Sequence, residues 1–259
     1  MRGVRKSRSP GNVGKHGHQN LSLQQAAADL AVLLAACPST EHADRARSAF
    51  DDLEKSKLRP TLLQDQRHLC VYCEVELMDD PANPPVVEHW EPVRADPHAA
   101  LLWENLYLSC LGRHTCDAEK GGRRLAWSDA DPSLPPACSC DYERFLGFGR
   151  GGDVYVKQGV NLTAAQRRAL ELAIDDRDDQ GILRKSILGL NHPDLVAARK
   201  AALDRERSRI QKLFPGKHAD PAAPELRSRA QSLIAASRRE SFVSIRLAWL
   251  EGHIGKARP

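Results

Sequence analysis

Apolar residues recur every three or four positions along most of the chain, whereas the alternation typical of strands is confined to short stretches. Leu21 to Cys37 is rich in alanine and leucine at helical spacing, and it predicts a helix. Ala43 to Lys57 predicts a charged amphipathic helix, which we expect to end at Arg59-Pro60-Thr61 because proline interrupts helices. A further short helix is expected from Thr61 through Arg67. Helix should therefore dominate the fold.

The second half of the chain combines one predicted β-hairpin with more helices. Phe145 to Phe148 and the alternating Val154 to Val156 flank a glycine-rich turn. Thr163 to Gln166 has the form of a capping box and opens a helix whose apolar positions continue, beyond a charged stretch, to Ile182 and Leu183. Three later helices are expected, running from the cap at Asn191 to Asp194 through Phe214, from Glu225 to Arg239, and from Ser241 to Gly252.

Most of the chemically distinctive residues lie between Leu62 and Gly122. Cys70 and Cys73 are two residues apart, the spacing that lets two thiolates reach one tetrahedral zinc ion from a tight turn. Cys110 and Cys116 can supply two more ligands. Four thiolates leave no open coordination position, so this zinc should be structural. Any reaction must then use other side chains of the same stretch.

Glu88 and His89 lie between the two cysteine pairs. Asn105 precedes the second pair, and Asp117 directly follows its last cysteine. This order resembles the zinc-containing HNH endonucleases. The resemblance implies a treble-clef-like ββα-metal core, in which a hairpin carries the Glu-His pair and a short helix carries the last metal ligand.

The same resemblance implies a role for each of these residues. His89 would be the general base that deprotonates the attacking water, a role that suits an imidazole because its pKa lies near the operating pH. Glu88 and Asp117 would hold one divalent cation, Mg²⁺ or Mn²⁺, which prefers oxygen ligands and polarises the scissile phosphate. Asn105 would brace the hairpin loop and so orient His89.

Three positions depart from the usual HNH pattern. The second cysteine pair is separated by five residues instead of two, so Leu111 to Thr115 must form a bulging loop. Glu88 stands where aspartate is commoner. His114 is an alternative to Asp117 at the third motif position, but we prefer Asp117 because the register should be counted from the metal-bound Cys116.

A closer likeness extends beyond this core. The motifs LCVYCE, VEHWEP, LLWENLYLSC and the C-D-x-x-K-G that begins at Cys116 are similar to the HNH subunit of the Septu and retron-associated anti-phage systems, as are Leu188 to Leu195 and Arg199. The likeness covers about residues 60 to 200. Members of that family work beside an ATPase of the ABC/SMC type, so the resemblance implies such a partner and a role in antiviral defence.

Composition limits the class of protein. The chain of 259 residues is 41% hydrophobic and 28% charged, and its net charge of +4 permits a nucleic-acid partner without requiring one. Seven cysteines could suggest a secreted disulfide scaffold, but in a chain this long the two spaced pairs favour metal binding in a reducing compartment. Cys37 is expected to be a small buried hydrophobe. No apolar stretch approaches the roughly 18 residues of a membrane span. We therefore expect a cytoplasmic protein.

These expectations combine into one α+β, mostly helical fold, with a ββα-metal core on a structural four-cysteine zinc site and helices on both sides. The predicted segments are a disordered basic N-terminus over residues 1–20, an N-terminal helical segment over 21–60, a nuclease core over 61–125, a linker and hairpin over 126–160, and a C-terminal helical region over 161–259.

The sequence leaves several interpretations open. Residues 1–20 are either an arm that contacts nucleic-acid phosphates or a solvated tail. Trp90 and Trp103 are either core anchors or platforms for stacked bases, and core is favoured because a small domain needs large buried side chains. Cys138 or Cys140 is an alternative to one member of the second cysteine pair.

A metal-dependent nuclease is the predicted function, with double-stranded DNA as the default substrate and single-stranded DNA or tRNA as alternatives. The competing interpretation is a non-catalytic zinc module that binds nucleic acid or protein. The set of Glu88, His89, Asn105 and Asp117 favours the nuclease, because a zinc module needs only the four cysteines. The oligomeric state cannot be read from the sequence.

Overall fold

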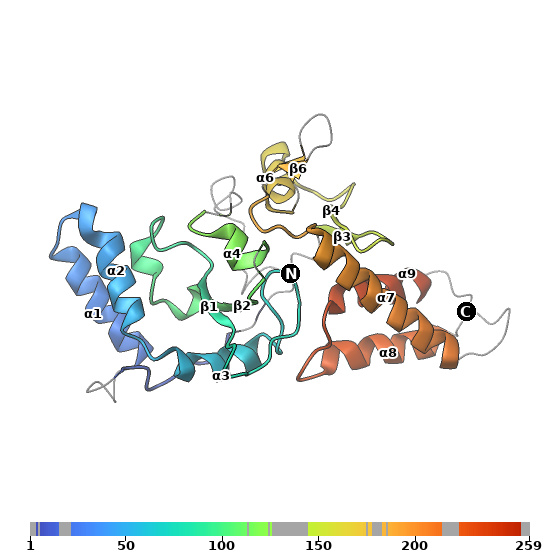
Figure 1. Ribbon diagram of the computed structural model, residues 1–259, viewed down its shortest axis with the longest axis horizontal. Coiled ribbons are helices and arrows are strands. Elements are labelled where there is room, and N and C mark those ends of the chain that lie inside the picture. Colours follow the sequence, from blue (N-terminus) through green and yellow to red (C-terminus); the bar gives the residue numbers. More distant parts are fainter. Residues whose placement is uncertain are drawn as a thin grey trace.

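The computed structural model describes residues 4, 6–15, 22–112, 114–123, 125, 145–174, 176–177, 183–184, 186–213 and 223–254. About half of these residues are helical, and their strands form three two-stranded antiparallel sheets (Figure 1). The predicted α+β class, with helix in excess, is therefore confirmed.

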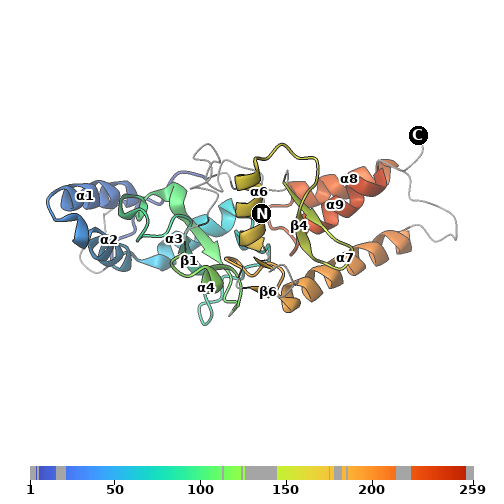
Figure 2. The same ribbon diagram turned by 90° about the horizontal axis from the view of Figure 1, so that it is seen from above.

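The chain begins with α1 (Leu23–Ala35), α2 (His42–Asp51) and α3 (Lys55–Asp65). The helix predicted over Leu21 to Cys37 is confirmed as α1, and it packs against α2 at one end of the molecule (Figures 1 and 2). Its inward face consists of apolar residues three and four apart, as expected for an amphipathic helix on a core. The buried residues of this face are Leu23, Ala26, Leu30 and Leu34.

The predicted break at Pro60 was wrong, because α2 ends at Asp51 and Pro60 lies inside α3. The turn falls at Leu53, whose side chain is 2% exposed and whose backbone bridges to another segment of the chain. Leu58 and Leu62, on either side of the proline, are fully buried. Burial of these leucines offsets the backbone hydrogen bond that proline removes from a helix.

Residues 6–15 run along this helical block, and the prediction that residues 1–20 are disordered was wrong for them. Val13 is fully buried, and its carbonyl accepts a hydrogen bond of 2.8 Å from the N–H of Glu54. Gly14 pairs with Leu53 as an antiparallel bridge. The sequence did not predict the packing of this segment. One buried valine and a few backbone hydrogen bonds hold it, and these produce no repeating pattern of apolar residues.

A hairpin and a short helix form the centre of the molecule. Strand β1 (Val86–His89) pairs antiparallel with β2 (Leu106–Ser109), which places Glu88 opposite Tyr107 and His89 opposite Leu106. A loop then leads to α4 (Cys116–Lys120). A two-stranded hairpin followed by a short helix is the order of elements that the motif predicted for this stretch.

Past the centre, β3 (Leu146–Phe148) and β4 (Val154–Val156) form the predicted second hairpin. The capping box of α6 (Ala164–Ile174) is also confirmed: Thr163 N–H donates to the Gln166 side chain at 2.8 Å, and Gln166 N–H donates to the Thr163 hydroxyl at 3.2 Å.

The expectation that the helical pattern continues past Ile174 was wrong. Strands β5 (Asp176–Arg177) and β6 (Leu183–Arg184) pair there instead. A two-residue strand carries too few positions for its alternation to be read from a sequence. The predicted irregular connection from Trp127 to Cys140 lies outside the described residues.

Leu188 to Asn191 ties the second hairpin to the centre. The N–H of Cys116 donates to the Leu188 carbonyl at 2.8 Å, and the Asn191 amide makes two hydrogen bonds, of 2.8 and 2.9 Å, with the backbone of Val154. Gly189 lies between them with φ +58°, where a Cβ would stand 2.4 Å from a backbone carbonyl. Glycine is therefore required at this position.

The last three helices are α7 (Pro193–Leu213), α8 (Ala223–Ala235) and α9 (Val243–Ile254), which lie together at the other end of the molecule (Figures 1 and 2). All three were predicted, although α8 ends earlier than expected. Glu206 on α7 has a fully buried side chain that pairs with Arg229 of α8 at 2.6 Å and with Arg246 of α9 at 3.3 Å. These ion pairs join the three helices around one buried carboxylate.

Within the part of the chain that the structure describes, we find no helix with both the length and the apolarity needed to cross a bilayer. The cytoplasmic location stays a prediction.

Val13→Ala should lower the free energy of unfolding by about 2 kcal/mol, because it removes two buried methyl groups from a fixed site. Urea denaturation of the variant and the parent protein measures the difference. Asn12→Ala, which changes the exposed neighbouring residue, serves as the control and should leave stability unchanged. Equal stability of all three proteins would show that the N-terminal segment does not pack as described.

Candidate active site and metal centre

Four cysteines from separate parts of the central stretch meet at one point. Cys70 and Cys73 lie on a turn between α3 and β1, Cys110 follows β2, and Cys116 begins α4. Their four sulfur atoms all lie within 4.8 Å of one another. The predicted cluster is therefore confirmed, and the spacing of five residues between Cys110 and Cys116 still allows both sulfurs to reach it.

The sulfur positions fit a single tetrahedral ion. The Sγ atoms of Cys70 and Cys116 are 3.8 Å apart, and those of Cys73 and Cys110 are 3.7 Å apart. A tetrahedron with Zn–S bonds of about 2.3 Å has corners about 3.8 Å from each other. The cluster is thus compatible with Zn²⁺ in a closed, structural site. A backbone N–H also points at the cluster, since Cys110 N–H donates to Cys70 Sγ at 3.4 Å.

Two residues of this centre have left-handed backbone conformations. Glu74 has φ +64° and Cys116 has φ +58°, and neither is glycine. Such residues cost about 1–3 kcal/mol each and persist only where the surroundings hold them. The N–H of Glu74 bonds to the Cys70 carbonyl, and that of Cys116 bonds to Leu188. A bound ion would offset this cost by holding both turns in place.

Arg199 of α7 is a buried positive charge beside the thiolates. It is 2% exposed, and it donates to the carbonyls of Gly152 and Leu190 at 3.0 and 2.5 Å. Burial lowers its pKa, whereas the nearby charge of Cys73 raises it. Four thiolates around a Zn²⁺ ion would carry two net negative charges, which would compensate a guanidinium that is otherwise costly to bury.

The other cysteines take no described part in the cluster. Cys37 is half-buried and packs against the core, which agrees with its expected role as a small hydrophobe. Cys138 and Cys140, the predicted alternatives for the second pair, lie outside the described residues.

Cys70→Ser should abolish zinc binding and cooperative unfolding, because structural zinc contributes about 10 kcal/mol or more to the folding of small metal domains. Metal analysis and a thermal melt of the purified variant test this. Cys37→Ser is the matched control, and it should keep both properties. A folded Cys70→Ser protein without zinc would refute the structural role.

A cavity of about 930 Å³ lies on another side of the hairpin. Its walls come from α2, β1, the loop after β1, and α4 with the glycines that follow it. Glu88, His89 and Asp117 all line this cavity. The three residues therefore share one cavity, and none of the four cysteines lines it.

The Glu88 carboxylate is buried among groups of both charges. It accepts hydrogen bonds from the Tyr72 hydroxyl at 2.9 Å and from the Lys120 ammonium at 2.5 Å, and it is 6% exposed. The pKa of Glu88 is raised to about 8, mainly by burial and also by Asp117, whereas Lys120 acts in the opposite direction. The carboxylates of Glu88 and Asp117 are oxygen donors of the kind that a hard divalent cation prefers.

His89 is held in one orientation inside the cavity wall. Its Nε2 lies 2.9 Å from the Ala100 carbonyl, and its ring packs edge-on against Phe50 with centroids 4.3 Å apart. The pKa of His89 is lowered to about 4, mainly by burial and also by Arg47 and Lys120, whereas the hydrogen bond with Ala100 acts in the opposite direction. The imidazole is therefore neutral near pH 7. Since a carbonyl can only accept, Nε2 carries the proton and Nδ1 is able to take one.

Asn105 fixes the loop between the two strands of the hairpin. Its side-chain amide donates to the carbonyls of Glu91 and Ala99, each at 3.0 Å, and its side-chain oxygen accepts from the N–H of Glu91 at 2.6 Å. Ala99 directly precedes Ala100, whose carbonyl contacts His89. Asn105 therefore holds the loop segment whose next carbonyl contacts the His89 ring, and it acts on His89 only through this backbone.

The two candidates for the third motif position differ in placement. Asp117 lines the cavity in the first turn of α4. His114 is exposed and stacks on the ring of His192, with centroids 5.8 Å apart. The geometry favours Asp117 over His114 as a partner of Glu88.

Sequence reasoning gave no role to two residues of this site, although Lys120 was part of the motif that begins at Cys116. Lys120 is 1% exposed, and its ammonium contacts Glu88 and the His89 carbonyl at 2.5 and 2.6 Å. Tyr72 is equally buried and bonds to the same carboxylate. A signal for Lys120 existed, because it lies three residues after Asp117 and so shares its face of a helix. Tyr72 had no signal beyond its place between two cysteines.

The two tryptophans of the central stretch are core residues. Trp90 is 5% exposed and stacks on Tyr72 with ring centroids 5.7 Å apart. Trp103 is 6% exposed, and its indole N–H donates to the Ser7 carbonyl at 2.9 Å. The core interpretation is confirmed, since buried indoles offer no face to a nucleobase.

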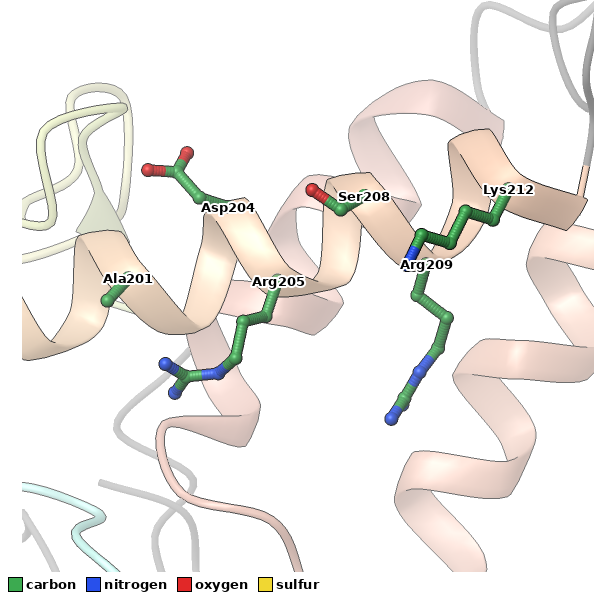
Figure 3. Close-up of a pocket in the computed structure, with 6 residues that line it drawn as sticks. All are labelled: Ala201, Asp204, Arg205, Ser208, Arg209 and Lys212. Carbon is green, nitrogen blue, oxygen red and sulfur yellow. The ribbon is translucent and has the colours of Figure 1, made fainter.

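A second hollow follows the outer side of α7, as Figure 3 shows. Arg205, Arg209 and Lys212 line it together with Asp204. The carboxylate of Asp204 pairs with Lys200 at 2.7 Å, and no histidine lines this hollow. It therefore offers positive charge but no general base.

Comparison of the sequence with models of known protein families gives no match, and comparison with characterised proteins gives no match either. The geometry of the site itself therefore carries the functional argument.

Proposed function

We propose that this protein is a metal-dependent HNH endonuclease, which hydrolyses phosphodiester bonds of nucleic acid on a ββα-metal core. The observation that supports this most is the meeting of Glu88, His89 and Asp117 in one cavity, separate from the four-cysteine cluster. A protein that used the cluster only to bind a partner would not need two carboxylates and a neutral imidazole together in a second place.

Each residue has a chemical task in this proposal. Glu88 and Asp117 hold the divalent cation, which when bound polarises the scissile phosphate and stabilises the leaving oxygen. His89 accepts the proton of the attacking water at Nδ1, while Ala100 keeps the opposite side of the ring protonated. Lys120 ties α4 to β1 through Glu88 and the His89 backbone, and thereby holds the two carboxylates against each other.

The cellular role in the proposal rests on the sequence motifs alone. The resemblance to the Septu and retron-associated HNH subunits supports a nuclease effector of anti-phage defence that works in the cytoplasm beside an ABC/SMC-type ATPase. DNA is the proposed substrate, with tRNA as the alternative. Purified protein incubated with plasmid and with total tRNA, in Mg²⁺ and in EDTA, with and without that ATPase, tests activity, substrate and partnership.

A non-catalytic zinc module is the second candidate function. The closed four-cysteine cluster supports it, because such a site stabilises a fold without taking part in a reaction. If this second function is the correct one, the protein should bind nucleic acid or another protein without Mg²⁺-dependent cleavage.

His89→Ala should abolish Mg²⁺-dependent cleavage, because general-base catalysis contributes about 10²–10⁴-fold in rate, while zinc content and folding stay intact. A cleavage assay on plasmid, paired with metal analysis, measures both. The control is His98→Ala, since His98 is an exposed histidine in the loop that follows β1. Equal activity of His89→Ala and the parent protein would reject the catalytic role.

Mg²⁺ binding should tighten as the pH rises toward about 8 and then level off. Below that value Glu88 is protonated, so the cation must displace a proton; above it the carboxylate is already ionised. Without cation, the raised pKa of Glu88 means that stability falls as the pH rises from its ordinary pKa to about 8. Thermal melts with and without Mg²⁺ across this pH range measure both effects.

In Glu88→Gln the Mg²⁺-induced rise in Tm should disappear at every pH. Glu104→Gln changes an exposed glutamate and should behave as the parent protein does. The same pH-dependent response to Mg²⁺ in Glu88→Gln would remove Glu88 from the cation site.

A further inference from the structure

Two arginines on the wall of the candidate active-site cavity have no partner in the described chain. Arg47 lies on α2 and Arg94 lies in the loop after β1, and both line the cavity and are exposed. Neither makes a hydrogen bond or an ion pair with any residue that the structure describes. Two guanidinium groups thus face the same cavity without a counter-charge attached to them.

The other cations of this cavity are already engaged. Lys120 binds Glu88, and Arg123 donates to backbone carbonyls that include those of Lys120 and Ser186. Arg47 and Arg94 are therefore the cationic side chains of this wall that stay available to a ligand. Arg47 is also close enough to His89 to lower the pKa of the imidazole.

The guanidinium groups of Arg47 and Arg94 indicate which kind of ligand this wall of the cavity would bind. A guanidinium presents paired N–H donors that match two oxygens of a phosphate, and it stays charged at all physiological pH values. Asp44 and Asp51 also line the cavity, so its field is not uniformly positive. An anion should therefore be held at the two guanidinium groups, and not by a general basic surface.

We infer that Arg47 and Arg94 bind backbone phosphates next to the one that is cut, so that a nucleic-acid strand runs from the loop after β1 across to α2. This inference rests on the proposed nuclease function for the position of the cut. It makes α2, which lies outside the hairpin and α4, a wall of the substrate site. The shared ligand chemistry is the phosphodiester backbone, from DNA or RNA.

Equilibrium binding in EDTA tests the inference without hydrolysis. Fluorescence anisotropy of labelled single-stranded and double-stranded oligonucleotides, as DNA and as RNA of the same sequence, is measured over a range of salt concentrations. Arg47→Ala and Arg94→Ala should each weaken binding of the preferred probe. Each should also reduce the slope of log K against log salt by about 0.7–0.9, the value expected for one lost phosphate contact.

Arg205→Ala is the matched control. Arg205 is an exposed arginine in the hollow along α7 (Figure 3), which lies on the opposite side of the molecule from α2 (Figures 1 and 2). The substitution removes the same charge, so binding should stay within about two-fold of the parent protein if local contacts decide affinity. All four proteins should keep their zinc content and Tm, because the replaced side chains are exposed.

The outcomes separate this inference from the proposed function. Binding that depends on Arg47 and Arg94 but is never followed by cleavage in Mg²⁺ supports the inference and contradicts the nuclease. If Arg47→Ala and Arg94→Ala both cleave with unchanged KM, the inference is overturned and the proposed nuclease function is unaffected. Equal weakening by Arg205→Ala, or no binding of any probe by the parent protein, also overturns it.

Discussion

Four cysteine sulfurs that meet within 4.8 Å set the geometry on which the rest of this structure depends. They come from the turn after α3, the end of β2 and the start of α4, so one ion would join three segments of the chain. Cys116 carries Asp117 with it, and the hairpin carries Glu88 on its other strand. The four-cysteine cluster therefore fixes the distance between the Glu88 and Asp117 carboxylates, although neither residue is part of the cluster.

The cavity combines burial with unbalanced charge. In a low-dielectric site an ionised carboxylate needs either a proton or a cation nearby, and Glu88 has a raised pKa because burial and Asp117 outweigh the attraction of Lys120. Burial lowers the pKa of His89, because the charged form of an imidazole is the protonated one and burial disfavours charge. One physical cause, burial, thus accounts for the raised pKa of Glu88 and for the neutral imidazole of His89.

The C-terminal helices are connected to the same centre. Glu74, which follows Cys73, accepts a hydrogen bond from the N–H of Ser244 at 3.0 Å at the start of α9, and its carbonyl accepts one from Phe242. Arg199 brings α7 against the thiolates from another direction. The four-cysteine cluster is therefore connected to the C-terminal helices as well as to the hairpin.

The sequence by itself determined what depends on near neighbours: the cysteine spacing, the second hairpin and the capping box at Thr163 follow from local patterns. The first hairpin was expected only from the resemblance of its motifs. Tertiary structure alone decided the rest. Pro60 remains in a helix because buried leucines flank it, and Val13 is buried through contacts that leave no periodicity. Arg47 reaches the cavity only because α2 folds against the hairpin loop, a contact between segments far apart in the sequence that no local pattern encodes.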